Sequence, residues 1–299
     1  MMFCRSCGQG YSSQNRLISN VRPVIKCVLR VPVSNTVHEL RRSFHRTKAH
    51  VQCSAPGVIN HDAWFQSEDS KLYKTHRPTT YLQKAILTVG SAFMSIYDPY
   101  RHDMVAVLGE TTGHLALKRI HSQMINHPEG QQILRERPRI NTHTVDMDLL
   151  AQLPEGTLGR EYQRFMTKNN ITSDSRAAVQ YVDDGELAYV MQRYREVHDF
   201  YHCLLGMPTT MLGEVVVKWF EMVNTRFPMC ALGAFVGPIR LTPRRRRILR
   251  EHYIPAVFRT ASKSELVLNC YFEKRWEEPI EEVRKDLRLD VIAKPTQNR

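Results

Sequence analysis

Two histidines and an aspartate stand at a spacing that could bind a metal ion. His198 and His202 are four residues apart, and Asp199 directly follows the first of them. On a helix, residues four apart lie on one face with Cβ atoms about 5–6 Å apart, so both rings could reach one ion. The two histidines of a zinc-binding HExxH helix have this spacing. Asp199 stands where that motif carries its catalytic glutamate, and its shorter side chain argues against a peptidase.

Glu214 is the next acidic residue along the chain. It follows His202 by twelve residues, which a straight helix would extend over about 18 Å. Residues 206–208 read Gly-Met-Pro, which ends helices, and Pro208 lies six residues from both His202 and Glu214. A helix–turn–helix centred there would bring two imidazoles and one or two carboxylates together, a ligand set that suits zinc or a similar divalent ion. The alternative is a buried hydrogen-bond network in which the carboxylates only orient the histidines.

The elements that must position these residues are helices. Hydrophobic runs of helical period dominate residues 59–290, which predicts a single all-α domain. The longest predicted helix covers 183–205 and carries both histidines, and the next covers 209–226 and carries Glu214. Strand signals are scarce, and residues 180–182 are the best candidate.

The first fifty residues differ in composition from the rest of the chain. They hold nine Lys/Arg and one acidic residue, so they carry +8 of the formal net charge of +12. A basic, Ser-rich segment almost free of acid is typical of a mitochondrial transit peptide. We therefore predict a disordered presequence at residues 1–50, with a basic arm as the alternative. The small excess of +4 in the rest excludes a strongly basic body, so we predict no nucleic-acid partner.

Two charge-free segments, 85–97 and 227–239, bear on membrane association. Each has thirteen residues, fewer than the roughly 17–25 of a membrane-spanning helix. We expect both in the core rather than on a membrane surface. Four arginines at 244–247 open a predicted helix and could contact anionic lipid headgroups, an acidic partner surface or only solvent.

Three arginines near the predicted metal site could bind a substrate carboxylate. They are Arg193, Arg195 and Arg240, and a surface ion pair is the expected role of each. Cys203, Cys230 and the more distant Cys270 are isolated from one another in sequence, so no disulfide framework is predicted and a reducing compartment suits them.

Residues 189–202, 205–209 and 213–214 together resemble the mitochondrial ubiquinone-biosynthesis protein four family, also called coenzyme Q protein four. Its members share an HDxxH-x11-E metal motif, and this sequence matches that motif without departure. The resemblance extends over residues 70–285 through further matching segments at 75–80, 108–113, 135–138, 154–157, 228–234, 271–273 and 275–278.

The resemblance implies a function and a location. The family is all-helical, peripheral to the matrix side of the inner mitochondrial membrane and part of a multiprotein complex of coenzyme Q biosynthesis enzymes. It implies metal-dependent C1 decarboxylation of 4-hydroxy-3-methoxy-5-polyprenylbenzoate to 2-methoxy-6-polyprenylphenol. By the motif, His198, Asp199, His202 and Glu214 would hold Zn²⁺ or another divalent metal. The alternative is a non-catalytic lipid-binding scaffold that organises the complex.

The motif leaves the catalytic group open. A metal-bound water or Asp199 would deliver the proton that C1 requires. Four ligands closing the site would favour the scaffold, whereas an open position would favour the enzyme.

Overall fold

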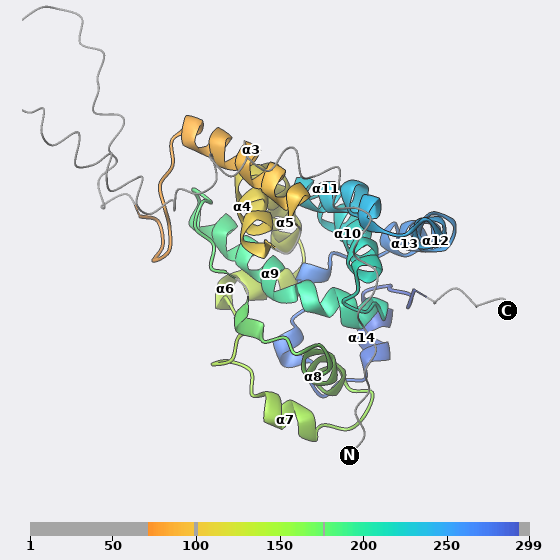
Figure 1. The fold of residues 1–299 in the computed structure, drawn as a ribbon. Helices are drawn as coiled ribbons and strands as arrows, with labels where there is room; N and C mark the ends of the chain where they lie inside the picture. Colours follow the sequence, from red (N-terminus) through yellow and green to blue (C-terminus); the bar gives the residue numbers. More distant parts are fainter. Residues whose placement is uncertain (1–70, 99–100, 176, 293–299) are drawn as a thin grey trace, which may run out of the picture. The chain divides into compact units, whose positions relative to one another are not determined.

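The computed structural model describes residues 71–98, 101–175 and 177–292 (Figure 1). Every regular element in these residues is a helix, and an isolated antiparallel bridge joins Thr157 and Pro279. The prediction of an all-α domain is therefore confirmed. The predicted transit peptide at 1–50 and the predicted domain start at 59 lie outside the described residues.

Many of the helices are joined by short turns, whereas residues 137–146 form a longer connection between α6 and α7. The first half of the described chain contains α3 (Tyr81–Tyr97), α4 (His102–Thr112), α5 (His114–Ile125), α6 (Pro128–Glu136), α7 (Met147–Gln152), α8 (Leu158–Asn169) and the 3₁₀ turn η3 (Ser173–Ser175). The second half contains α9 (Gly185–Leu205), α10 (Met211–Thr225), α11 (Pro228–Val236), η4 (Gly237–Arg240), α12 (Pro243–Ile248), the π-turn η5 (Leu249–Tyr253), α13 (Ile254–Ala261), η6 (Val267–Asn269), η7 (Phe272–Lys274) and α14 (Ile280–Asp286).

Helix α9 runs through the centre of the fold (Figure 1). Asp184 begins it by accepting hydrogen bonds from the backbone amides of Glu186 and Leu187. Gly206 ends it at φ 67°, in the left-handed region that glycine enters without strain. From Leu187 onward every residue of α9 is buried, and α5, α8, α10 and η6 all contact the helix. Both histidines therefore lie inside the molecule.

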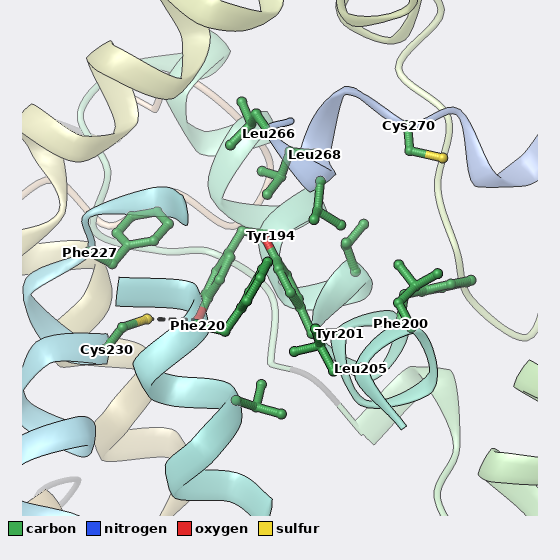
Figure 2. Packing of buried hydrophobic residues seen from close by; sticks show 14 of the residues in the cluster. Tyr194, Phe200, Tyr201, Leu205, Phe220, Phe227, Cys230, Leu266, Leu268 and Cys270 are labelled. Atoms are coloured by element: carbon green, nitrogen blue, oxygen red, sulfur yellow. Dashed lines mark hydrogen bonds between the residues drawn. The ribbon is translucent and has the colours of Figure 1, made fainter. Parts of the chain in front are cut away.

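Aromatic packing fixes the rotation of α9 about its axis. Phe200 stacks on Tyr162 of α8 and on Phe272 of η7, with ring centroids 4.3 Å apart in both pairs. Trp276 lies 5.8 Å from Tyr162 and from Phe200. Figure 2 shows Phe200 and Tyr201 among the buried side chains of this core. Because each such ring contributes about 1.5–3 kcal/mol by burial, turning α9 to point its histidines elsewhere would be costly.

The chain reverses direction between α9 and α10. Next to the turn, His202 faces Glu214, and farther from it Tyr194 contacts Lys218. The residue number falls along α9 as it rises along α10, which shows that the two helices are antiparallel. The position of Pro208 predicted this reversal.

Gly213 allows the turn to close tightly. A Cβ atom at this position would lie 1.9 Å from the carbonyl oxygen of Pro208, so only glycine fits. Thr210 caps α10, and its side-chain oxygen accepts a hydrogen bond from the Gly213 amide. Together these contacts set where Glu214, the following residue, stands relative to α9.

Helix α3 contradicts the expectation that residues 85–97 lie in the core. Only Ser91 is buried in this helix. Leu82, Ile86, Val89 and Phe93 recur every three or four residues and are 57%, 63%, 71% and 57% exposed. Helical periodicity correctly predicts the element, but its apolar stripe is exposed, and the helix packs against α4 with Ser91 as its buried residue.

The second charge-free segment, 227–239, forms α11 and η4. Met229 and Cys230 are buried, as expected, whereas Phe235 and Ile239 are exposed. None of the helices in the described residues has the length and apolar content needed to cross a bilayer.

Residues 180–182, the best strand candidate, do not form a strand. Glu110 accepts hydrogen bonds from the backbone amides of Gln180 and Tyr181, and Tyr73 donates to the Val182 carbonyl. Side chains therefore satisfy backbone groups that a neighbouring strand would otherwise have to pair.

Candidate metal centre

The centre lies between the C-terminal half of α9 and the first turn of α10. His198 and His202 project from the same face of α9, with ring centroids 5.1 Å apart and ring planes at 83°. Glu214 extends from α10 toward both rings. Its Oε2 lies 3.6 Å from His198 Nε2, and its Oε1 lies 3.3 Å from His202 Nε2. The ligand atoms of the three residues all lie within 4.8 Å of one another.

The other nitrogen of each ring is already occupied. His198 Nδ1 lies 2.7 Å from Glu221 Oε1, and His202 Nδ1 lies 3.2 Å from the Met207 carbonyl oxygen. Both partners are acceptors, so each Nδ1 carries the proton that it donates to them. In the neutral rings, both Nε2 atoms then present lone pairs toward Glu214.

This arrangement fits a divalent cation. Two imidazole lone pairs and a carboxylate converge, and they repel one another unless a proton or a metal ion lies between them. His202 Nε2 is buried and has no hydrogen-bond partner in the described part of the chain. Metal-binding histidines commonly donate their second N–H to a carboxylate or a backbone carbonyl, as both rings do here. His198, His202 and Glu214 therefore form a possible metal-binding group.

The electrostatics of the site favour positive charge. Burial and the Lys218 ammonium lower the pKa of His198, but Glu221 and Glu214 outweigh them and leave it raised. Burial would raise the pKa of Glu214, yet protonated His198 and His202 rings would hold it well below its usual value through hydrogen bonds and charge attraction. A site that stabilises an imidazolium beside a carboxylate also stabilises a bound cation.

Asp199 is not a member of this group of three. It is buried, at 3% exposure, on the same helix. Its charge lies close enough to Cys203, one helical turn on, to contribute with burial to raising the pKa of that thiol well above its usual value. Of the four residues expected to bind metal, the structure thus brings three together and places Asp199 beside them.

The arginines near the site have structural roles. Arg193 is fully buried, with its guanidinium paired to Glu273, and Arg195 is buried and paired to Glu110. These are interior ion pairs rather than the expected surface pairs. Arg240 donates hydrogen bonds to the last carbonyl groups of α3.

Sequence analysis missed two residues behind the centre. Glu221 and Lys218 both contact His198, and their side chains are 0% and 21% exposed. Glu214, Lys218 and Glu221 are spaced i, i+4, i+7, which places them on one face of a helix. This charged stripe on an otherwise apolar helix could have identified Lys218 and Glu221 from the sequence.

The sequence matches the family described as coenzyme Q (ubiquinone) biosynthesis protein Coq4 over residues 73–293. The chain belongs to the Coq4 family. The human ubiquinone biosynthesis protein COQ4 homolog, mitochondrial, is 57% identical over 224 residues, covering 75% of this chain and 84% of that protein. The protein of the same name from Danio rerio is 50% identical over 248 residues, covering 83% and 90%. Membership places the chain in ubiquinone biosynthesis, and these homologues are named mitochondrial.

A solved structure has the same fold. A putative ubiquinone biosynthesis protein from Nostoc punctiforme aligns with a TM-score of 0.55 and 20% identity, covering 70% of this chain and 98% of that one. At this identity the likeness concerns the helical architecture alone.

Proposed function

We propose that this Coq4-family chain is a metal-dependent carboxy-lyase of ubiquinone biosynthesis. Its substrate would be 4-hydroxy-3-methoxy-5-polyprenylbenzoate, which loses its C1 carboxyl group to give 2-methoxy-6-polyprenylphenol. The proposal is carried by the convergence of His198, His202 and Glu214, with the Nδ1 atoms of both rings hydrogen-bonded to other groups of the protein. We further propose that the chain acts in a complex with other coenzyme Q biosynthesis enzymes.

Zinc is the metal that we propose, because His₂Glu is an established ligand set for catalytic zinc. Manganese, iron or magnesium would accept the same donor types. His198, His202 and Glu214 would hold the ion. Asp199 belongs to the motif that predicted four ligands, but it lies outside the group of three. We therefore assign Asp199 the delivery of the proton.

The reaction requires little rearrangement of atoms. A proton adds to C1 of the para-hydroxylated ring, and the bond from C1 to the carboxyl carbon then breaks. The electron pair of that bond restores the aromatic ring, and the carboxyl group leaves as carbon dioxide. A bound divalent ion would supply positive charge that orients the substrate carboxylate. The chain would hold the carboxylate end of the substrate beside Glu214, whose side chain is 37% exposed, and the proton at Asp199.

The scaffold alternative makes a different demand on the site. A structural zinc ion is usually enclosed by four protein ligands, whereas a catalytic one keeps a position for substrate. A group of three ligands with a partly exposed Glu214 supports the enzyme.

Removal of the metal is expected to abolish the reaction reversibly. The full-length protein would be dialysed against a chelator, reloaded with one equivalent of Zn²⁺ and incubated with ring-carboxyl-labelled short-chain substrate while released carbon dioxide is counted.

Asp199→Asn should retain zinc and lose carbon dioxide release, because it cannot supply the proton. Zinc bound at one equivalent without carbon dioxide release, even with partner enzymes added, would favour the scaffold.

We also propose that the protein binds peripherally to the matrix face of the inner mitochondrial membrane through α3. The apolar stripe on α3 has no charged side chain of its own, and Lys84, on the opposite face, pairs with Asp183. Arg240 donates hydrogen bonds to the last carbonyl groups of α3. Four exposed arginines, at 244–247 in α12, follow it along the chain. An exposed apolar helix face is typical of a segment that lies on a bilayer surface, and exposed arginines elsewhere on the same chain add attraction to anionic lipids.

A second copy of the chain is the less favourable occupant of this surface. A symmetric dimer would cover this stripe with its own copy, but it would leave the exposed arginines at 244–247 without an anionic partner. An anionic bilayer supplies both an apolar layer and negative charge.

Replacing Ile86 and Phe93 with glutamate is expected to weaken binding to vesicles containing anionic phospholipid by more than tenfold. Each change removes a large apolar contact and adds a charge of the wrong sign. Co-sedimentation with the vesicles measures the effect. Leu149→Glu is the matched control, because Leu149 is 61% exposed on α7, away from α3 in Figure 1. Equal binding by all variants, or a wild-type dimer disrupted only by the double variant, would contradict the proposal.

A further inference from the structure

Glu221 of α10 is a buried carboxylate with both oxygens engaged. Its side chain is 0% exposed. Oε1 lies 2.7 Å from His198 Nδ1, and Oε2 lies 2.6 Å from the Lys218 ammonium and 3.6 Å from Cys230 Sγ. The Lys218 ammonium therefore pairs with the negative charge of Glu221 inside the protein. A buried charge of this kind is costly unless it is fully paired.

Further contacts hold the carboxylate in one orientation. Lys218 Nζ also lies 3.4 Å from the Tyr194 hydroxyl, which in turn lies 3.2 Å from Cys230 Sγ (Figure 2). Tyr194 and Cys230 come from α9 and α11, so three helices meet around one carboxylate. Glu221 therefore cannot turn away from His198 without breaking several interior contacts.

We propose that Glu221, fixed by Lys218, is the positioning residue of the metal centre. It keeps the proton of the neutral His198 ring on Nδ1 and so directs the Nε2 lone pair toward Glu214. Its negative charge also raises the basicity of His198 as a ligand. This inference rests on the proposed metal site, but not on the reaction that the site catalyses.

The two histidine ligands are consequently unequal. His202 donates its Nδ1 proton to the Met207 carbonyl, a neutral acceptor in the turn, whereas His198 donates to a full negative charge. Hydrogen bonds to charged acceptors are stronger than those to neutral ones. His198 is thus the stronger donor to the metal, and its strength depends on a residue that does not touch the ion.

The test is zinc affinity in the full-length protein. Glu221→Gln keeps the size of the side chain and removes its charge, and it should weaken zinc binding about 10–100-fold, as loss of an outer-shell partner does. Competition with a chromophoric chelator measures the affinity. In the zinc-loaded protein, the downfield His198 Nδ1–H proton resonance should move upfield when the charged acceptor is lost. A structural role alone would not move that resonance.

Glu273→Gln is the matched control. It also removes the carboxylate of an interior ion pair, with Arg193, but among the described residues Glu273 makes no hydrogen bond or ion pair with the three ligands. Its zinc affinity should stay within twofold of wild type. If Glu221→Gln unfolds, the Glu221→Gln/Lys218→Met double variant removes both charges together and should show the same loss of affinity.

The outcomes separate this inference from the proposed function. Zinc affinity unchanged in both Glu221 variants would overturn the positioning role. Wild-type protein that binds zinc but releases no carbon dioxide would overturn the decarboxylase proposal, while a Glu221-dependent affinity would still support positioning. Wild-type protein that binds no zinc would overturn both.

Discussion

Zinc binding and carbon dioxide release are both expected to be lost when Glu214 is replaced with glutamine. The substitution keeps the shape of the side chain but removes the negative charge that faces both Nε2 atoms, at 3.3 and 3.6 Å. Loss of a direct ligand should cost more than the roughly 10–100-fold that an outer-shell partner contributes. Metal content after gel filtration and release from labelled substrate measure the two effects.

His202→Ala tests the same centre from the other helix. His202 is 1% exposed, so this variant would also open a cavity, and its circular dichroism must match wild type before activity is compared. Glu281→Gln, at a side chain 74% exposed on α14, is the control for loss of a carboxylate elsewhere. Full metal content in Glu214→Gln would show that the metal binds elsewhere in the protein. The group of three would then be a cluster of polar side chains and no metal site.

The sequence predicted those features that depend on near neighbours along the chain. Four-residue spacing placed His198 and His202 on one face of a helix, and Pro208 predicted the reversal that brings Glu214 back to them. Both follow from backbone geometry, because helix repeat and proline stereochemistry act over only a few residues.

Features that depend on distant segments were not predicted. The apolar stripe on α3 fits a buried helix as well as an exposed one, and only the packing of α4 against its other face decides between them. Glu221 is a charged residue that the sequence alone would place on a solvated helix face, yet contacts with His198, Lys218 and Cys230 hold it in the interior.

Replacing Glu110 with alanine is expected to lower the free energy of unfolding by about 3–5 kcal/mol, the usual cost of removing one partner of a buried ion pair. Glu110 is 5% exposed and pairs with Arg195 of α9, three residues before His198. It also accepts hydrogen bonds from the backbone amides of Gln180 and Tyr181, so alanine would leave a buried cation without its counter-charge and two amides without their acceptor. For a domain of this size the loss corresponds to a drop of roughly 6–20 °C in Tm.

Asp103→Ala provides the comparison within the same helix. Asp103 pairs with Arg101 at the start of α4, where the two side chains are 52% and 45% exposed. Exposed pairs contribute about 0–1 kcal/mol, so its Tm should fall by no more than a few degrees. The contrast isolates burial, because both variants remove one carboxylate paired with one arginine. An equally small shift in both would mean that Arg195 finds another acceptor, and that apolar packing alone holds α9 and its histidines in register with α10.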